Sequence, residues 1–295
     1  MIAWAREARP ASRNWWAVVL LLILLVRGTS AWSVEKVTGT LLVKDALTGP
    51  NQSVAIEAKL IHKGLLGDAE LGGEPLELVR NGEVVAKAMT GGDGRAVFQF
   101  TPKTRGMATL SVRVGESPRV SPAEATANVA VWERRTPILA VEVAALTEEA
   151  VASTPVPALS LDRKPERHPI PDAADELNKL TQFYYNVIYV AAPEDDRSGG
   201  FSTNQQIRAW LKAHKFPLGY ILVLSGGSDA LGVQLDELHT AGWKTLKVGI
   251  GRSSAFAEAF LQRRLEAVIV PEPTKGEVPR KAKVAKEWKE VRKKL

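Results

Sequence analysis

The chain contains no cysteine, and this absence removes several kinds of chemistry at once. Disulfide bonds, thiolate nucleophiles, thiolate metal sites and a lipid-modified cysteine after a leader segment are all excluded. Histidine is nearly as scarce, and the spacing of the four residues does not match that of a metal site: His62, His168, His214 and His239. No Gly-x-Ser-x-Gly pattern occurs, so a nucleophile elbow is unsupported. We therefore expect no metal site and no nucleophile of these types.

Acidic residues are outnumbered, but the excess of positive charge is confined to one segment. The formal net charge is +6. Residues 275–295 hold nine Lys or Arg against three Glu, which accounts for all of it. A nucleic-acid-binding protein usually spreads such charge over a folded groove. We expect no nucleic-acid partner.

Long apolar runs are rare, and the notable one lies near the start of the sequence. Arginines at 6, 9 and 13 precede twelve apolar residues, 15–26, and small residues follow at 28–31. This order is typical of a secretory signal peptide. Twelve helical residues reach about 18 Å, short of the roughly 30 Å of a bilayer core, although an uncleaved anchor stays open. Residues 1–31 therefore predict export out of the cytoplasm, to the periplasm or beyond, with membrane anchoring as the alternative.

Residues 33–134 show short alternating segments separated by turn residues, which predict seven strands. The expected strands are 37–43, 53–60, 75–79, 84–89, 96–100, 108–114 and 127–132. Asn81-Gly82 between two of them is a strong hairpin signal, since both positions favour positive φ. The turns at 81–82 and 90–94 and the Phe98-Gln-Phe-Thr-Pro run resemble bacterial immunoglobulin-like repeats of surface and periplasmic proteins. The expectation is an all-β immunoglobulin-like sandwich.

Beyond residue 135 the pattern changes to apolar runs that alternate with helix-length segments. Strands are expected at 138–144, 186–192, 220–224 and 246–250, with amphipathic segments between them. This alternation is typical of βαβ units and a parallel sheet covered on both faces. We expect a multidomain chain, with a Rossmann-like α/β domain over 136–274 after the sandwich.

The order and spacing of this region resemble the haloacid dehalogenase-like (HAD) superfamily, particularly its phosphatidate-phosphatase-like branch. The segments that carry the resemblance are Ile138–Thr147, Ile170–Leu180, Val187–Glu194, Gly232–Leu238 and Val248–Ala255. The resemblance implies an aspartate nucleophile, a second aspartate as acid and base, a hydroxyl and a lysine that hold the phosphoryl group, and an acidic magnesium ligand. In this sequence the matching positions hold, in that order, Glu142, Ala144, Ala191, Gln234 and Ala255. Alanine cannot donate, accept or ligate, so we expect a catalytically dead site without a cofactor.

Two other interpretations of this region stay open. Asp162 follows a short apolar run and could act as the nucleophile in a different register, although it lacks a paired acid. Gly249, Gly251, Arg252, Ser253 and Ser254 form a small-residue turn at an expected helix start, which suits an anion. A plain strand-to-helix turn is the alternative.

The basic segment 275–295 is compatible with a helix after Pro279, and it carries a thin apolar stripe. Packing of that stripe on the sheet and contact with an anionic membrane surface are both open. The function expected from the whole sequence is that of an exported, non-catalytic binding or structural protein with a protein partner in an envelope assembly. The alternative is an extracytoplasmic magnesium-dependent phosphatase-like hydrolase with relocated catalytic groups.

Overall fold

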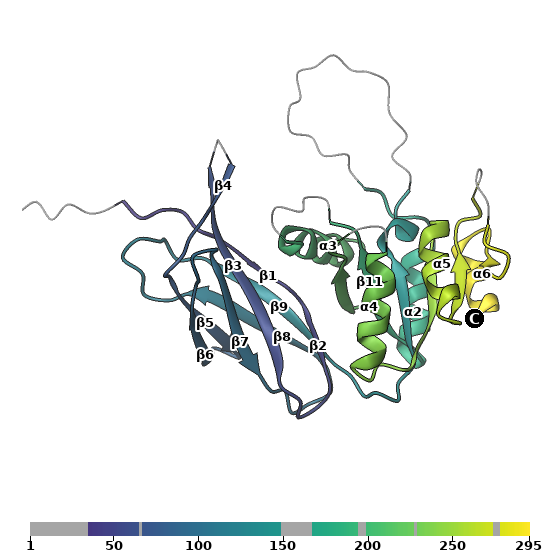
Figure 1. Ribbon diagram of the computed structural model, residues 1–295, viewed down its shortest axis with the longest axis horizontal. Coiled ribbons are helices and arrows are strands. Elements are labelled where there is room, and N and C mark those ends of the chain that lie inside the picture. Colours follow the sequence, from purple (N-terminus) through teal and green to yellow (C-terminus); the bar gives the residue numbers. More distant parts are fainter. Residues whose placement is uncertain (1–34, 65–66, 149–166, 194–198, 227–228, 274–277) are drawn as a thin grey trace, which may run out of the picture. The chain divides into compact units, whose positions relative to one another are not determined.

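The computed structural model describes residues 35–64, 67–148, 167–193, 199–226, 229–273 and 278–295 (Figure 1). Val37–Leu295 form one compact unit. The expected signal or anchor segment 1–31 and Asp162 lie outside the described residues. Among the described residues, no helix is long and apolar enough to cross a membrane.

The first part of this unit is a two-sheet β-sandwich. Its strands are β1 (Thr40–Val43), β2 (Ala46–Thr48), β3 (Val54–Gly64), β4 (Gly67–Glu70), β5 (Pro75–Arg80), β6 (Glu83–Met89), β7 (Arg95–Phe100), β8 (Gly106–Val114) and β9 (Glu124–Val131). One sheet contains β1, β3, β4 and β7, and the other has the order β2-β9-β8-β5-β6. The pairing is antiparallel except between β2 and β9, which run parallel. The seven expected strands are confirmed, and β2 and β4 are additions.

Alternation of side chains builds the core of the sandwich. In β7 every second residue is buried, so Ala96, Phe98 and Phe100 face the other sheet while Val97 stays exposed. Asn81 and Gly82 have φ values of 52° and 86°, and they join β5 to β6 as the hairpin signal predicted.

The second part is a six-stranded parallel sheet. Its strands are β10 (Ile138–Glu142), β11 (Asn186–Ala191), β12 (Tyr220–Val223), β13 (Leu246–Gly251), β14 (Glu266–Ile269) and β15 (Lys283–Val284). They lie in the order β12-β11-β10-β13-β14-β15. The order runs outward in one direction from β10 to β12 and then reverses to β13, which is the doubly wound Rossmann-like arrangement. The expected α/β class is confirmed, whereas the sequence did not predict β14 and β15.

Helices cover both faces of this sheet. They are α2 (Ala173–Phe183), α3 (Phe201–Ala213), α4 (Ala230–Thr240), α5 (Ser254–Gln262) and α6 (Trp288–Lys294), with a 3-10 turn η1 (Val143–Leu146) after β10. In β10, Leu139 and Val141 belong to the core cluster that includes residues of α2, α3 and α6. Ile138 and Ala140 belong to the cluster that includes residues of α4 and α5. Burial on both faces explains why the strands read as continuous apolar runs.

Residues 278–295 form an integral part of the α/β layer. The helix begins at Trp288 rather than soon after Pro279, and β15 precedes it. The Trp288 side chain is fully buried, and its Nε1–H donates to the Ala145 carbonyl oxygen at 2.9 Å. Val291 is also fully buried in the same cluster. Of the two open interpretations, packing of the apolar stripe on the sheet is therefore observed.

Helix α3 also contacts the sandwich through its amino-terminal half. Phe201 is fully buried in a small cluster with Leu42 and Ile61. Arg208 forms an ion pair with Asp45, whose side chain is completely buried, and also donates to the Asn204 side chain. A buried ion pair of this kind is weak evidence of net stabilisation, because the cost of removing two charges from water offsets their attraction.

Candidate functional site

The carboxyl ends of β10 and β13 meet where the strand order reverses, and open α/β sheets bind ligands at such a point. Glu142 is the last residue of β10 and lies in register with Val190 of β11. Gly251 ends β13 on the other side, and α5 begins three residues later at Ser254. The topology thus brings together Glu142 and the small-residue turn, which are more than a hundred positions apart in the sequence.

The Glu142 carboxylate binds directly to this turn. Its Oε2 accepts hydrogen bonds from the backbone N–H groups of Arg252 at 2.6 Å and Ser253 at 3.0 Å. Its Oε1 accepts from the Ser253 hydroxyl at 2.7 Å. Ser253 is the N-cap of α5, and its Oγ also accepts from the Phe256 N–H at 3.2 Å. Both carboxylate oxygens are therefore used, and a negative charge sits at the positive end of a helix dipole.

Two glycines allow the carboxylate and the helix to approach β13 closely. A Cβ on Gly251 would lie 2.9 Å from Glu142 Oε2 and 2.3 Å from the Phe256 ring. A Cβ on Gly249 would lie 2.8 Å from the ring of Phe260. Contacts this short leave no room for a side chain, which gives a packing reason for small residues in β13.

The remaining expected site residues are placed as follows. Ala144 lies exposed in η1, and Ala191 is buried at the end of β11, next to the register partner of Glu142. Ala255 is exposed in the first turn of α5, after Ser254. Gln234 lies on α4, where it donates to Glu237 at 2.7 Å. It lines a cavity of about 510 Å³ that none of the other four residues lines.

The described residues at this edge do not suit a magnesium ion. Magnesium requires oxygen ligands that are free to coordinate. The Glu142 oxygens instead accept from two N–H groups and a hydroxyl, and alanines stand at 144 and 255. Elsewhere in the described ranges, no group of three or more His, Asp or Glu side chains is arranged to hold a metal.

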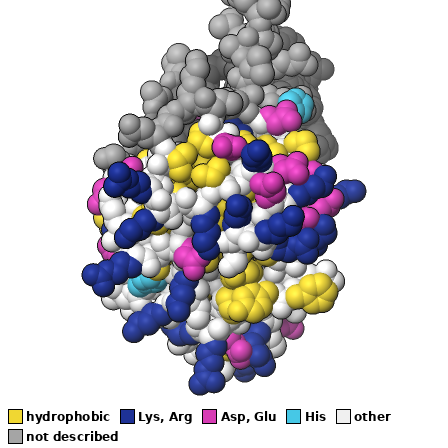
Figure 2. All heavy atoms as spheres, turned by 90° about the vertical axis from the view of Figure 1, so that its right-hand side faces the viewer, with side chains coloured by type: hydrophobic (Ala, Val, Ile, Leu, Met, Phe, Trp, Pro, Cys, Tyr) yellow, Lys and Arg dark blue, Asp and Glu magenta, His cyan; other side chains and the backbone are white. Residues whose placement is uncertain are grey.

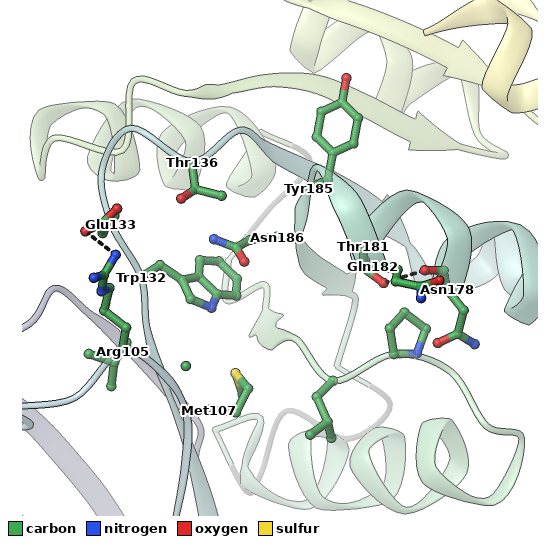
Figure 3. Close-up of a pocket in the computed structure, with 14 residues that line it drawn as sticks. Arg105, Met107, Trp132, Glu133, Thr136, Asn178, Thr181, Gln182, Tyr185 and Asn186 are labelled. Carbon is green, nitrogen blue, oxygen red and sulfur yellow. Dashed lines mark hydrogen bonds and ion pairs between the residues drawn. The ribbon is translucent and has the colours of Figure 1, made fainter.

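A separate cavity of about 460 Å³ lies between the sandwich and the amino-terminal edge of the sheet (Figure 3). Its lining includes Met107, Trp132, Gln182 and Asn186, which Figure 3 draws as sticks. Two charged side chains that line it, Arg105 and Glu133, form an ion pair with each other at 2.7 Å. No local pattern in the sequence predicts this cavity, because its residues come from segments that are far apart along the chain.

No protein-family description matches the chain, and no curated protein matches it either. Among solved structures, the D,D-heptose 1,7-bisphosphate phosphatase from B. bronchiseptica, complexed with magnesium and phosphate, is 14% identical. The match has a TM-score of 0.40 and covers 54% of this chain and 97% of that one.

The sandwich is similar to β-domains of other proteins. Fibronectin(III)-like modules of Clostridium thermocellum CbhA match at 15% identity and a TM-score of 0.24, over 32% of this chain and 47% of that one. The titin M3 domain matches at 14% identity and a TM-score of 0.23, and the match covers 31% of this chain and 92% of that one. Likenesses this loose carry no argument about function, and the two fold classes rest on the strand orders described above.

Proposed function

We propose that the α/β domain is non-catalytic, and that the protein serves as an exported binding or structural component. The observation that carries the proposal is the Glu142 carboxylate, whose two oxygens are held by Arg252 N–H, Ser253 N–H and the Ser253 hydroxyl. This carboxylate occupies the donors that an external phosphate would need. The protein thus carries its own anion at the point of the sheet where a ligand would bind.

The geometry also supports the loss of nucleophilic chemistry at this position. A nucleophile must direct a free oxygen at the reacting atom, and a general base needs a free lone pair that can reach a proton. An incoming phosphate would meet the negative charge of Glu142 and would have to displace three hydrogen bonds. With alanine at positions 144 and 255, Glu142 is better suited to fixing the turn before α5 than to attacking phosphorus.

The proposed ancestry is the phosphatidate-phosphatase-like branch of the HAD superfamily. It is supported by the motif order along the sequence and by the position of Glu142 at the end of β10, the first strand of the sheet in the sequence. The proposed location is outside the cytoplasm, in the periplasm or envelope, on the strength of residues 1–31. A protein partner in an envelope assembly is the corresponding proposed role.

The test is phosphate-ester turnover by the full chain, with p-nitrophenyl phosphate as substrate, with and without magnesium. We expect wild type and Glu142→Ala to give the same background rate. Glu142→Gln is the matched variant, since it keeps the size of the side chain and removes its charge. A magnesium-dependent rate that falls at least a hundredfold in both variants would refute the proposal.

The same turnover assay distinguishes the non-catalytic proposal from the alternative of a hydrolase with relocated catalytic groups. If turnover survives Glu142→Ala and disappears in Asp162→Asn, the catalytic group lies in the other register. If neither substitution matters and no turnover exceeds background, the non-catalytic proposal stands and work turns to partners.

A further inference from the structure

Three large apolar side chains are exposed at the amino-terminal edge of the parallel sheet. Phe183 is 81% exposed, Tyr184 is 61% exposed and Leu218 is 68% exposed. Phe183 is the most exposed large apolar residue in the described part of the chain. Exposed apolar side chains that gather at one edge are candidates for an interaction surface.

These three residues come from two loops that the structure holds together. Phe183 and Tyr184 end α2 just before β11, and Leu218 lies just before the neighbouring strand β12. The Asn178 side chain, which projects from α2, donates to the Lys215 carbonyl oxygen of the second loop at 2.9 Å. Because β11 and β12 are adjacent and parallel, both loops lie at the same edge of the sheet.

Exposed lysines lie at this edge, and α6 carries further basic side chains toward it. Lys212 and Lys215 are exposed at the end of α3 and in the loop before Leu218. Lys289 and Arg292 of α6 form ion pairs with Asp172 at 3.0 Å and Glu176 at 3.2 Å. From Lys289 to Arg292 along α6, the ion-pair partner moves forward along α2 from Asp172 to Glu176. The two helices therefore run parallel, and their carboxyl ends point toward the same edge of the sheet.

The end of α6 therefore adds positive charge toward the same edge of the sheet. Lys293 is exposed in its last turn, and the carbonyl oxygen of Lys294 accepts from Lys283. Lys283 also pairs with Glu266, the first residue of β14, so the end of α6 points toward the amino-terminal edge. Figure 2 looks onto the side of the molecule that carries α6, and it shows Lys and Arg side chains spread over that face with apolar side chains exposed between them.

We propose that this edge binds an anionic lipid surface. The patch, called the rim patch below, consists of Phe183, Tyr184, Leu218, Lys212, Lys215 and Lys293. Aromatic side chains suit the boundary between headgroups and acyl chains, where the ring is apolar and the Tyr hydroxyl stays wet. Lysines around them add attraction to anionic headgroups.

The choice of basic residue favours lipid over an acidic protein as the occupant. The rim patch combines exposed lysines with exposed apolar side chains, and Lys is depleted at protein–protein interfaces. Lysine carries a compact, mobile charge that needs no fixed partner geometry, which suits a fluid headgroup layer. Each lysine near such a surface contributes about fivefold in binding. The proposal does not depend on whether the α/β domain is catalytic.

The test is sedimentation of the full chain with sucrose-loaded vesicles of phosphatidylcholine, alone or mixed with phosphatidylglycerol, at low and high salt. Two double variants probe the rim patch: Phe183→Ser with Tyr184→Ser, and Lys215→Glu with Lys293→Glu. All four side chains are exposed, so the fold should survive, and circular dichroism checks this. The apolar segment 15–26 is the same in every variant, so differences between variants report the rim patch.

Matched controls come from exposed positions of the sandwich. Met89→Ser with Val97→Ser removes two apolar side chains that are 60% and 54% exposed. Lys63→Glu with Lys103→Glu reverses two exposed charges. We expect the charge reversal in the rim patch to weaken binding to the mixed vesicles at least about twentyfold, from two fivefold losses, and the controls to change it less than twofold.

Several outcomes would overturn the proposal. Wild type that binds mixed vesicles no better than phosphatidylcholine would remove the role of lipid charge. Equal losses in rim-patch and control variants would indicate general charge or surface effects. Binding to soluble polyglutamate as strong as to mixed vesicles, and unchanged by Phe183→Ser with Tyr184→Ser, would point to an acidic polymer or protein instead.

Discussion

The buried carboxyl group of Asp45 predicts a stability that falls as the pH rises from mildly acidic to neutral. Its side chain has no exposed surface, and Oδ1 accepts from the Asn128 N–H at 2.9 Å and from Arg208. Oδ2 has no hydrogen-bond partner among the described residues. Burial raises the pKa of Asp45 from 3.8 to about 6, although Arg208 and the Asn128 N–H act to lower it.

The sign follows from proton binding. The folded state holds the Asp45 proton up to about pH 6, whereas the unfolded chain releases it near the ordinary pKa. The folded state therefore binds more protons between these values, and its stability declines as the pH rises through them. A difference of about two pH units, at about 1.4 kcal/mol each, corresponds to about 3 kcal/mol.

The assay is urea unfolding of wild type and Asp45→Asn, followed by tryptophan fluorescence from pH 4 to pH 7. Other titrating groups largely cancel in the difference between the two free energies of unfolding. We expect wild type to lose about 3 kcal/mol relative to the variant over this range. A difference that stays flat, or that grows in favour of wild type, would mean that the Arg208 ion pair outweighs burial.

Three further predictions follow from the packing of the α/β layer. Trp288→Ala should lower the free energy of unfolding by about 3–5 kcal/mol, because it leaves a cavity at a fully buried site and removes the hydrogen bond to the Ala145 carbonyl oxygen. Urea denaturation measures this loss, and a value below about 1 kcal/mol would contradict the prediction. Glu142→Ala should lower the free energy of unfolding by about 2 kcal/mol, and Glu142→Gln should lower it by less because the amide keeps one acceptor oxygen. Equal losses in the two variants would refute the role of these hydrogen bonds. Gly249→Ala should lower the free energy of unfolding by about 1–3 kcal/mol, because the added methyl group would clash with the Phe260 ring. The loss should appear as a lower midpoint of thermal unfolding, and an unchanged midpoint would show that the ring can move.

The local signals in the sequence predicted most of the strands correctly. The hairpin at Asn81-Gly82 and the strands around it follow from turn chemistry and alternation, which neighbouring residues determine. Strand β2 was missed because it is three residues long and pairs with β9, about eighty positions away. Strand β4 was missed because its four residues are all exposed and show no alternation.

The candidate site was predictable only in part. The placement of Glu142 near the end of a strand followed from the apolar run before it, although the expected strand extended to 144 and β10 ends at Glu142. Its contact with Ser253 did not, because that contact depends on the placement of β13 beside β10 rather than on any local pattern. The exposure of Phe183 was equally hidden, since an aromatic residue at the end of an amphipathic helix is ordinarily assumed to face the core.

The position of β15 and α6 has a consequence for the order in which this protein can acquire its structure. Synthesis and any translocation deliver the chain from its amino end, so β10 and η1 emerge long before Trp288. The buried faces of Ala145 and Leu177 share a cluster with Trp288 and Val291. Until residues 283–291 are available, that surface cannot be covered, so the α/β layer is expected to complete its folding only after these residues have emerged.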